Sequence, residues 1–230
     1  MNESRRLRFA SYNIYHGGKA GYDMSKIARN ITDNRIDVIG IQEVDQATSR
    51  SGGIDTLAEL SRATGYQYYA FFKTMRFDGG DYGTAILSRY PIIESEKILL
   101  ESGNSEPRAL GRAKIDIGGR EISFFVTHLT FDSALIRRGQ LTQLKDLLKN
   151  YQDFVLSGDF NTSDLGELDE CDGVSRINKK DDLTVTFPED LIAIDNIVYS
   201  NRTWRFEKIN TVTDSYSDHY MIWAEAELIE

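Results

Sequence analysis

Polar side chains of a few recurring types follow short apolar runs along the whole chain. They carry amide, carboxylate and imidazole groups: Asn13, Gln42, Glu43, His128, Asp159, Asn161, Asp195, Asp218 and His219. Side chains in loops at strand ends are held by a rigid sheet, and functional sites are often built there. The pattern therefore predicts one site that is assembled from the ends of several strands.

These residue types suit metal and phosphate chemistry. Carboxylates without cysteine neighbours favour Mg²⁺ or Mn²⁺, asparagine can hold phosphate oxygens or water, and two histidines can exchange protons near neutral pH. The sequence has no nucleophile elbow and no Gly-Lys-Ser/Thr phosphate loop. Water is therefore the expected nucleophile, in preference to a side chain.

Each of these residues also has a simpler structural explanation when taken singly. Glu43 could be a solvated loop acid and His128 a hydrogen-bonded structural histidine. Asn13 could close a turn, and Asp195 could be a charge at a sheet edge. Six such positions, all at strand ends, make the joint functional interpretation the stronger one.

Apolar residues at helical spacing predict three helices. One follows Asp23 as its N-cap, one covers residues 54–64 with Gly65 as its stop, and one covers residues 134–150. Expected strands outnumber helices about three to one, which favours two packed sheets with helices outside. Residues 162–190 are polar and are expected to form an irregular surface segment. The expected strands are residues 7–14, 38–41, 66–72, 83–88, 111–117, 121–127, 154–156, 194–199, 203–208 and 219–228.

Length and composition limit the class of protein. The 230 residues fit one large α/β domain spanning 1–230. A single cysteine, Cys171, excludes an intramolecular disulfide framework and cysteine-rich zinc sites. With 40% hydrophobic residues and three prolines, the chain is neither disordered nor collagen-like.

Charge and hydropathy point to an acidic protein with no transmembrane segment. No run approaches the roughly 18 apolar residues that span a bilayer, and no signal peptide is visible, so we expect a cytoplasmic monomer. A secreted protein whose signal had been removed would look the same. The net charge of −9 argues against a protein that coats nucleic acid. Residues 162–190 carry nine acidic and three basic side chains.

The order of the motifs closely resembles the endonuclease/exonuclease/phosphatase superfamily, the deoxyribonuclease-I-like phosphoesterases. The resemblance runs from Leu7 to about Ala226 and implies an α/β four-layer sandwich, in which two mixed β-sheets pack face to face with helices on the outer faces. The motifs are Ser11-Tyr12-Asn13-Ile14, Ile41-Gln42-Glu43-Val44, Tyr82-Gly83-Thr84-Ala85-Ile86-Leu87-Ser88, Thr127-His128-Leu129, Gly158-Asp159-Phe160-Asn161, Ile194-Asp195 and Ser217-Asp218-His219.

The resemblance assigns a metal side and a water side to the site. It implies that Glu43 is the principal ligand of Mg²⁺ or Mn²⁺, that Asn13 lies beside the ion, and that Asp218 is a second metal contact. It implies that Asp159 orients or deprotonates the attacking water. Asn161 would hold that water and a phosphate oxygen.

The resemblance also assigns the groups around the phosphate. It implies that Asp195 pairs with His219, which would bind the phosphate as a cation because a carboxylate partner raises a histidine pKa. His128 would support the leaving oxygen or grip the phosphate. Arg108 and Tyr82 are expected to bind substrate.

The expected function is divalent-metal-dependent hydrolysis of a phosphoester, as a phosphodiesterase or a phosphatase, by in-line attack of water. The substrate could be a small molecule, a lipid headgroup or a nucleic acid. The acidic stretch 162–190 favours a short substrate over long duplex DNA. A nuclease acting on DNA or RNA is the alternative, and a non-catalytic binding protein on the same fold is the alternative of another class. Asn196 stands where relatives commonly have histidine or tyrosine, which leaves the Asp195–His219 pairing open.

Overall fold

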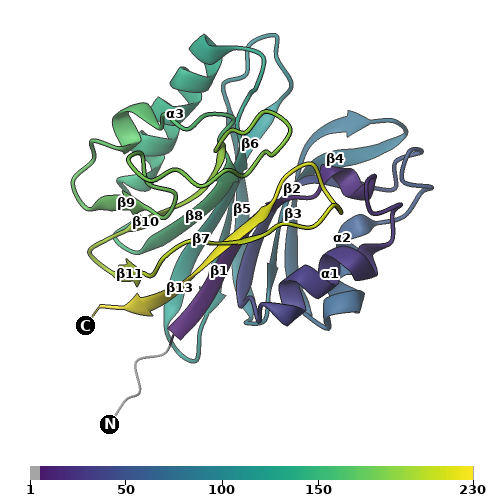
Figure 1. Ribbon diagram of the computed structural model, residues 1–230, viewed down its shortest axis with the longest axis horizontal. Coiled ribbons are helices and arrows are strands. Elements are labelled where there is room, and N and C mark those ends of the chain that lie inside the picture. The colour runs from purple at the N-terminus through teal and green to yellow at the C-terminus, as the bar shows by residue number, and fades with distance from the viewer. Residues whose placement is uncertain (1–5, 230) are drawn as a thin grey trace.

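The computed structural model describes residues 6–229, which form thirteen strands and three α-helices (Figure 1). Two mixed β-sheets pack face to face and helices cover their outer faces, so the predicted fold class is confirmed. The first five residues, which carry part of the expectation about a signal peptide, lie outside the described residues.

The first sheet has β1 and β2 at its centre, and they are its parallel pair. Every other pairing in this sheet is antiparallel. In spatial order its strands are β11 (Trp204–Phe206), β13 (Met221–Leu228), β1 (Arg6–Asn13), β2 (Val38–Gln46), β4 (Gly80–Ser88) and β3 (Tyr68–Phe77), with β12 (Asn210–Val212) also paired to β13.

The second sheet repeats this plan around the parallel pair of β7 and β8. Its order is β5 (Ile92–Leu100), β6 (Arg108–Asp116), β7 (Glu121–His128), β8 (Phe154–Asp159), β10 (Asp195–Ser200) and β9 (Val174–Arg176). The hairpin predicted across Gly118-Gly119 is present as β6 and β7.

Three apolar clusters correspond to the three interfaces between the four layers. The cluster between the sheets contains Phe9 and Phe124, whose rings stack with centroids 5.8 Å apart. A second cluster joins the first sheet to α1 (Met24–Asp33) and α2 (Thr56–Thr64), and a third joins the second sheet to α3 (Ala134–Leu148). Burial of apolar surface on both faces of each sheet holds the layers together.

The helix starts follow from capping side chains. Asp23 accepts a hydrogen bond from the Ser25 amide, and Ser133 accepts one from the Ile136 amide. The second helix begins two residues later than predicted, because Asp55 is its N-cap and accepts from the Ala58 amide.

Some elements differ from the sequence prediction. The edge strand β5 was missed, because Glu94, Glu96 and Lys97 interrupt its apolar pattern; charges on an edge strand discourage pairing with another chain. The short strand β12 was also missed. Residues 162–190 are not wholly irregular, since they contain β9 and a 3₁₀ turn at Gly166–Leu168.

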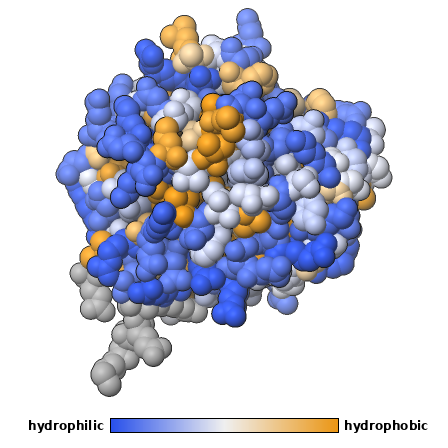
Figure 2. All heavy atoms as spheres, in the orientation of Figure 1, coloured by the Kyte–Doolittle hydropathy of each residue, from blue (hydrophilic) through white to orange (hydrophobic). Residues whose placement is uncertain are grey.

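The surface visible in Figure 2 is mostly hydrophilic and is broken by several hydrophobic patches. Within residues 6–229, none of the helices combines the length and the apolar character needed to cross a bilayer.

Gly40 of β2 lies against the second sheet with no room for a side chain, and this gives a test of the packing. A Cβ atom there would lie 1.8 Å from Ser157 Oγ and 2.9 Å from Val126 Cγ2 of the other sheet. We expect Gly40→Ala to lower the free energy of unfolding by about 1–3 kcal/mol, measured by urea denaturation. The control is Gly139→Ala inside α3, where nothing lies within 4 Å. Because alanine favours helix, that variant should gain up to about 1 kcal/mol; equal stability of Gly40→Ala and wild type would contradict the packing described.

Candidate active site

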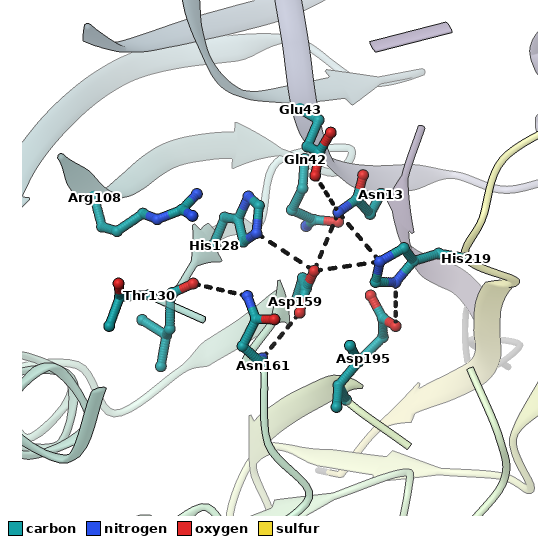
Figure 3. Close-up of polar contacts among 12 residues, drawn as sticks. Asn13, Gln42, Glu43, Arg108, His128, Thr130, Asp159, Asn161, Asp195 and His219 are labelled. Carbon is teal, nitrogen blue, oxygen red and sulfur yellow. Dashed lines mark hydrogen bonds and ion pairs between the residues drawn. The ribbon is translucent and has the colours of Figure 1, made fainter. Parts of the chain in front are cut away.

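Most of the predicted site residues lie close together (Figure 3). They are Asn13, Glu43, Arg108, His128, Asp159, Asn161, Asp195 and His219. Strands β1 and β2 are parallel and bring Asn13 and Glu43 to the same edge of the first sheet. Strands β7 and β8 do the same for His128 and Asp159 in the second sheet, where these two residues are partners in the register. Both sheets therefore contribute side chains to a single cluster.

Asp159 is the centre of this cluster and is only 1% exposed. Its Oδ2 accepts a hydrogen bond from Asn13 Nδ2 at 3.1 Å and lies 3.4 Å from His128 Nε2 and 3.7 Å from His219 Nε2 (Figure 3). Its Oδ1 accepts from the Asn161 amide at 2.9 Å. One carboxylate thus contacts three side chains, from β1, β7 and the segment before β13, and one backbone amide of its own loop.

Asn161 is fixed by a tight turn after β8. Its backbone has φ 54°, in the left-handed region that asparagine tolerates better than most residues. The turn is closed by the bond to Asp159, and Asn161 Nδ2 donates to the Leu129 carbonyl at 2.9 Å. The side chain is therefore held next to Asp159.

Antiparallel strands bring Asp195 and His219 to the same place. Asp195 starts β10 directly opposite Asp159 in the register. His219 precedes β13, and its Nδ1 lies 2.9 Å from Asp195 Oδ2. Asn196, the departure from the family pattern, leaves this contact intact because its amide group bonds to the backbone of Asn178 instead.

Three residues that were not among the expected catalytic, substrate-binding or metal residues support this pair. The Thr186 hydroxyl accepts from the Asp195 amide at 3.1 Å, and the Phe187 ring packs edge-on against His219 with centroids 5.0 Å apart. The Ser217 hydroxyl donates to the Asn13 carbonyl at 2.7 Å. In the sequence, the Thr-Phe-Pro run at 186–188 was the motif that could have indicated a role for Thr186 and Phe187.

The two histidines have opposite electrostatic environments. Burial disfavours the charged form of His219, but Asp195 and Asp159 outweigh it and raise the pKa of His219 to about 10. Burial lowers the pKa of His128 well below its usual value, and the nearby Arg108 guanidinium lowers it further. At neutral pH the site therefore combines a cationic and a neutral imidazole.

Asp159 has a pKa suited to proton transfer. Burial and the neighbouring Asp195 carboxylate raise the pKa of Asp159 to about 7, although His219 and Asn13 oppose this shift. A carboxylate that gains and loses a proton near neutral pH can act as a general base.

The metal side of the site is rich in carboxylates. Glu43 lies in an irregularity of β2 with φ 58°, and its Oε1 accepts from Asn13 Nδ2 at 3.1 Å. Burial raises the pKa of Glu43, and the negative charge of Asp218 raises it further. Glu43 and Asp218 offer carboxylate oxygens, which are the donor atoms that fit a hard divalent cation.

A second group of ligand atoms lies nearby. Asp159, Asp195 and His219 each offer one atom, and these atoms all lie within 4.8 Å of one another, so the trio could hold a metal ion. Two facts argue against this metal site. His219 Nδ1 already contacts Asp195, and a protonated imidazole has no nitrogen lone pair with which to bind a metal ion. The physical argument therefore favours the Glu43 side.

Arg108 and Tyr82 are both buried near the cluster. Arg108 is 3% exposed, forms an ion pair with Glu106 at 3.0 Å and lies beside His128 (Figure 3). Burial raises the pKa of the Tyr82 hydroxyl well above its usual value, and the negative charge of Glu43 adds to the effect. Both side chains are therefore close enough to influence the charge in the site.

Comparisons with solved structures agree with this architecture. The protein is similar to an endonuclease/exonuclease/phosphatase from Beutenbergia cavernae, with a TM-score of 0.81 and 20% identity over 97% of this chain and 72% of that one. It is similar to a Bacteroides thetaiotaomicron mannosyl-6-phosphatase, with a TM-score of 0.72 and 19% identity over 97% and 100%. It is also similar to D. rerio TDP2 complexed with a single-strand DNA product, with a TM-score of 0.73 and 18% identity over 96% and 99%. At these identities the likeness shows the fold.

The family is shown by the sequence. The model of the endonuclease/exonuclease/phosphatase family matches residues 10–219, which is most of the chain and includes every polar residue of the cluster. Members of this family are hydrolases that act on phosphoester bonds, and they generally depend on divalent metal ions. This chain belongs to the endonuclease/exonuclease/phosphatase family.

Proposed function

We propose that this protein hydrolyses a phosphoester bond of a small or short substrate, using Mg²⁺ or Mn²⁺ and a water nucleophile. The observation that carries the proposal is the buried His219–Asp195 pair at 2.9 Å, with Asp159 only 3.7 Å from the imidazole. A cation suited to phosphate thus faces a carboxylate suited to activating water.

Glu43 would hold the metal ion, with Asn13 and Asp218 beside it. The pKa of Glu43 is raised by burial and by Asp218, so a cation at this position would stabilise both charged carboxylates. A bound divalent ion offsets the charge of the phosphoryl group and stabilises the leaving oxygen.

Asp159 would orient the water and accept its proton, because the pKa of Asp159 is raised to about 7. Asn161, held against Asp159 and the Leu129 carbonyl, would position the water and a phosphate oxygen. With no covalent intermediate, one in-line attack predicts inversion of configuration at phosphorus.

The remaining groups would stabilise the charge that develops on the phosphoryl oxygens. His219 would donate from Nε2 as a cation, while Asp195 holds its Nδ1. His128, neutral and buried, would donate one hydrogen bond to the phosphate or the leaving oxygen, and Arg108 would add positive charge behind it.

The acidic stretch at residues 162–190 supports a preference for short substrates, because its charge repels a long polyanion. A nuclease remains the second candidate, since one structural neighbour is complexed with a single-strand DNA product. A binding protein without activity is the third candidate, and mutation of the site separates it from the other two.

The catalytic roles of His219 and Asp159 can be tested with bis(p-nitrophenyl) phosphate and p-nitrophenyl phosphate in Mg²⁺ or Mn²⁺. We expect His219→Ala and Asp159→Asn each to lower kcat by about 10²–10³-fold, because each removes a contact to the developing charge or to the nucleophile. Asp146→Asn, on the exposed face of α3, is the control and should retain the wild-type rate. Wild-type activity in both site variants would overturn the assignment.

The metal side can be tested by removing the ion. EDTA should abolish hydrolysis and excess Mg²⁺ or Mn²⁺ should restore it. Glu43→Gln should raise the metal concentration that gives half-maximal rate by at least about tenfold, since it removes the proposed ligand. Glu59→Gln in α2 should leave this concentration unchanged. If Glu43→Gln requires no more metal than wild type, Glu43 is not the ligand.

The stability of the metal-free protein should depend on the His219–Asp195 pair. The folded-state pKa of His219 is about 10 against an ordinary value of 6.5, so the stabilisation is complete below pH 6.5 and is lost as the pH rises through 10. Asp159 also changes the free energy of unfolding with pH, but it does so at lower pH, because its folded-state pKa is about 7. Its contribution changes little above pH 7.

In EDTA, we therefore expect the free energy of unfolding to fall by about 2 kcal/mol between roughly pH 7.5 and 9. His219→Gln should remove most of this fall, whereas His16→Gln should keep it. Urea titrations at both pH values provide the measurement. Identical pH dependence in wild type and His219→Gln would show that the pair does not stabilise the fold.

A further inference from the structure

Arg50 lies at the metal side of the site and has no role in the chemistry described above. Asp45 follows Glu43 by two residues on β2 and is fully buried. Its two carboxylate oxygens accept from Arg50 Nε at 2.6 Å and Nη2 at 2.8 Å. This two-point contact fixes the plane and the direction of the guanidinium group.

Two aromatic rings hold the same guanidinium from another side. Its central carbon lies 4.5 Å from the Phe77 ring centroid and 5.6 Å from that of Tyr82. Cation–π contacts of this kind favour one position of the charge. Arg50 is therefore held beside Tyr82 by these contacts. Burial lowers the pKa of Arg50, but Asp45 and, more weakly, the charge of Glu43 outweigh it and raise the pKa.

The loop that carries Arg50 is fixed by other bonds. The Arg50 amide donates to Asp78 Oδ2 at 2.6 Å, and the Thr48 hydroxyl donates to Asp45 Oδ2 at 2.7 Å. The Arg50 side chain is 28% exposed, and its Nη1 has no hydrogen-bond partner within residues 6–229. One edge of a preorganised guanidinium is thus free to bind a ligand.

Lys19 is a second cation near the metal side of the site. Lys19 is exposed, and its ammonium lies 5.8 Å from the Tyr15 ring centroid. The Tyr15 amide donates to Asn13 Oδ1 at 3.0 Å, which ties this loop to the metal side. The rings of His16 and Tyr15 pack with centroids 4.6 Å apart. Burial lowers the pKa of His16 and the charge of Arg50 lowers it further, which indicates that the loop with His16 lies near the loop with Arg50.

We propose that Arg50, assisted by Lys19, binds a second acidic group of the substrate, a carboxylate or a phosphate, next to the phosphoryl group that is hydrolysed. The inference rests on the proposed function, because it takes the Glu43 side as the place of the reacting phosphate. Asp45, which binds Arg50, follows Glu43 by two residues on β2, so we expect the second acidic group to lie a few bonds from phosphorus. The substrate is then a small phosphoester that carries at least two anionic groups.

A purely structural ion pair is the alternative explanation for Arg50. In that case the arginine would stabilise the loop and would not distinguish ligands that differ in their second charge. The comparison of two ligands on the same protein separates these explanations, because a loss of folded protein affects both ligands equally.

Binding can be measured by calorimetry in excess Mg²⁺ with phosphonates, whose P–C bond resists hydrolysis. Propylphosphonate carries only the phosphoryl-like group. 3-Phosphonopropionate adds a carboxylate in place of the methyl group, and propane-1,3-diphosphonate adds a phosphonate. Wild type should bind at least one of the two doubly acidic ligands about 10–100-fold more tightly than propylphosphonate, as expected for a charge-assisted hydrogen bond. The stronger of the two identifies the kind of second acidic group.

Arg50→Gln should reduce this preference to below about threefold, and Lys19→Gln should reduce it by about two- to fivefold, as expected for an exposed charge. Arg62→Gln is the matched control, because Arg62 is an exposed arginine that pairs with Glu59 on α2. It should retain the full preference.

A wild-type preference near onefold for both ligands, or a preference that survives Arg50→Gln, would overturn the inference. If Arg50→Gln does not fold, the wild-type preference and its reduction in Lys19→Gln decide the question. Hydrolysis of the chromogenic esters is measured separately. Absence of the preference in the wild type, with retained hydrolysis, therefore contradicts only the second acidic subsite, whereas absence of metal-dependent hydrolysis contradicts the proposed function.

Discussion

The buried carboxylate of Asp159 is the constraint on which the site depends. A charge in this position is costly unless it is neutralised or hydrogen-bonded, and the surrounding groups meet that requirement. Asn13 approaches it from the first sheet, Asn161 from its own loop, and His128 and His219 from two further segments. The same contacts that make the charge tolerable also place a carboxylate, an imidazole cation and an amide around one point. The groups that stabilise Asp159 are therefore the same groups that the proposed reaction uses.

The strand directions explain why these side chains meet. Each sheet has one parallel pair at its centre, β1 with β2 and β7 with β8, and parallel strands deliver their carboxyl ends to the same edge. Antiparallel neighbours contribute residues at the starts of strands. Asp195 is the first residue of β10, and His219 lies just before β13. The fold thus collects polar residues that are more than 200 positions apart in the sequence.

Much of this arrangement could be predicted from the sequence, for physical reasons that differ between elements. Buried strands such as β8 are continuous apolar runs, and helices such as α1 begin at a capping side chain with apolar residues at helical spacing. The edge strand β5 escaped prediction because Glu94, Glu96 and Lys97 interrupt its apolar pattern. At the site, residue types and order suggested the principal groups. Arg50 carries no such signal, because its importance comes from contacts that exist only in the folded chain.

The division of the site between two sheets has a consequence for how activity arises during folding. Asn13 and Glu43 belong to the first sheet, and His128 and Asp159 belong to the second, so the proposed site requires both sheets. The first sheet is itself incomplete until β13 pairs with β1. With the roles proposed above, a nascent chain is therefore expected to lack activity toward phosphoesters until residues 217–228 have been synthesised and β13 has paired with β1.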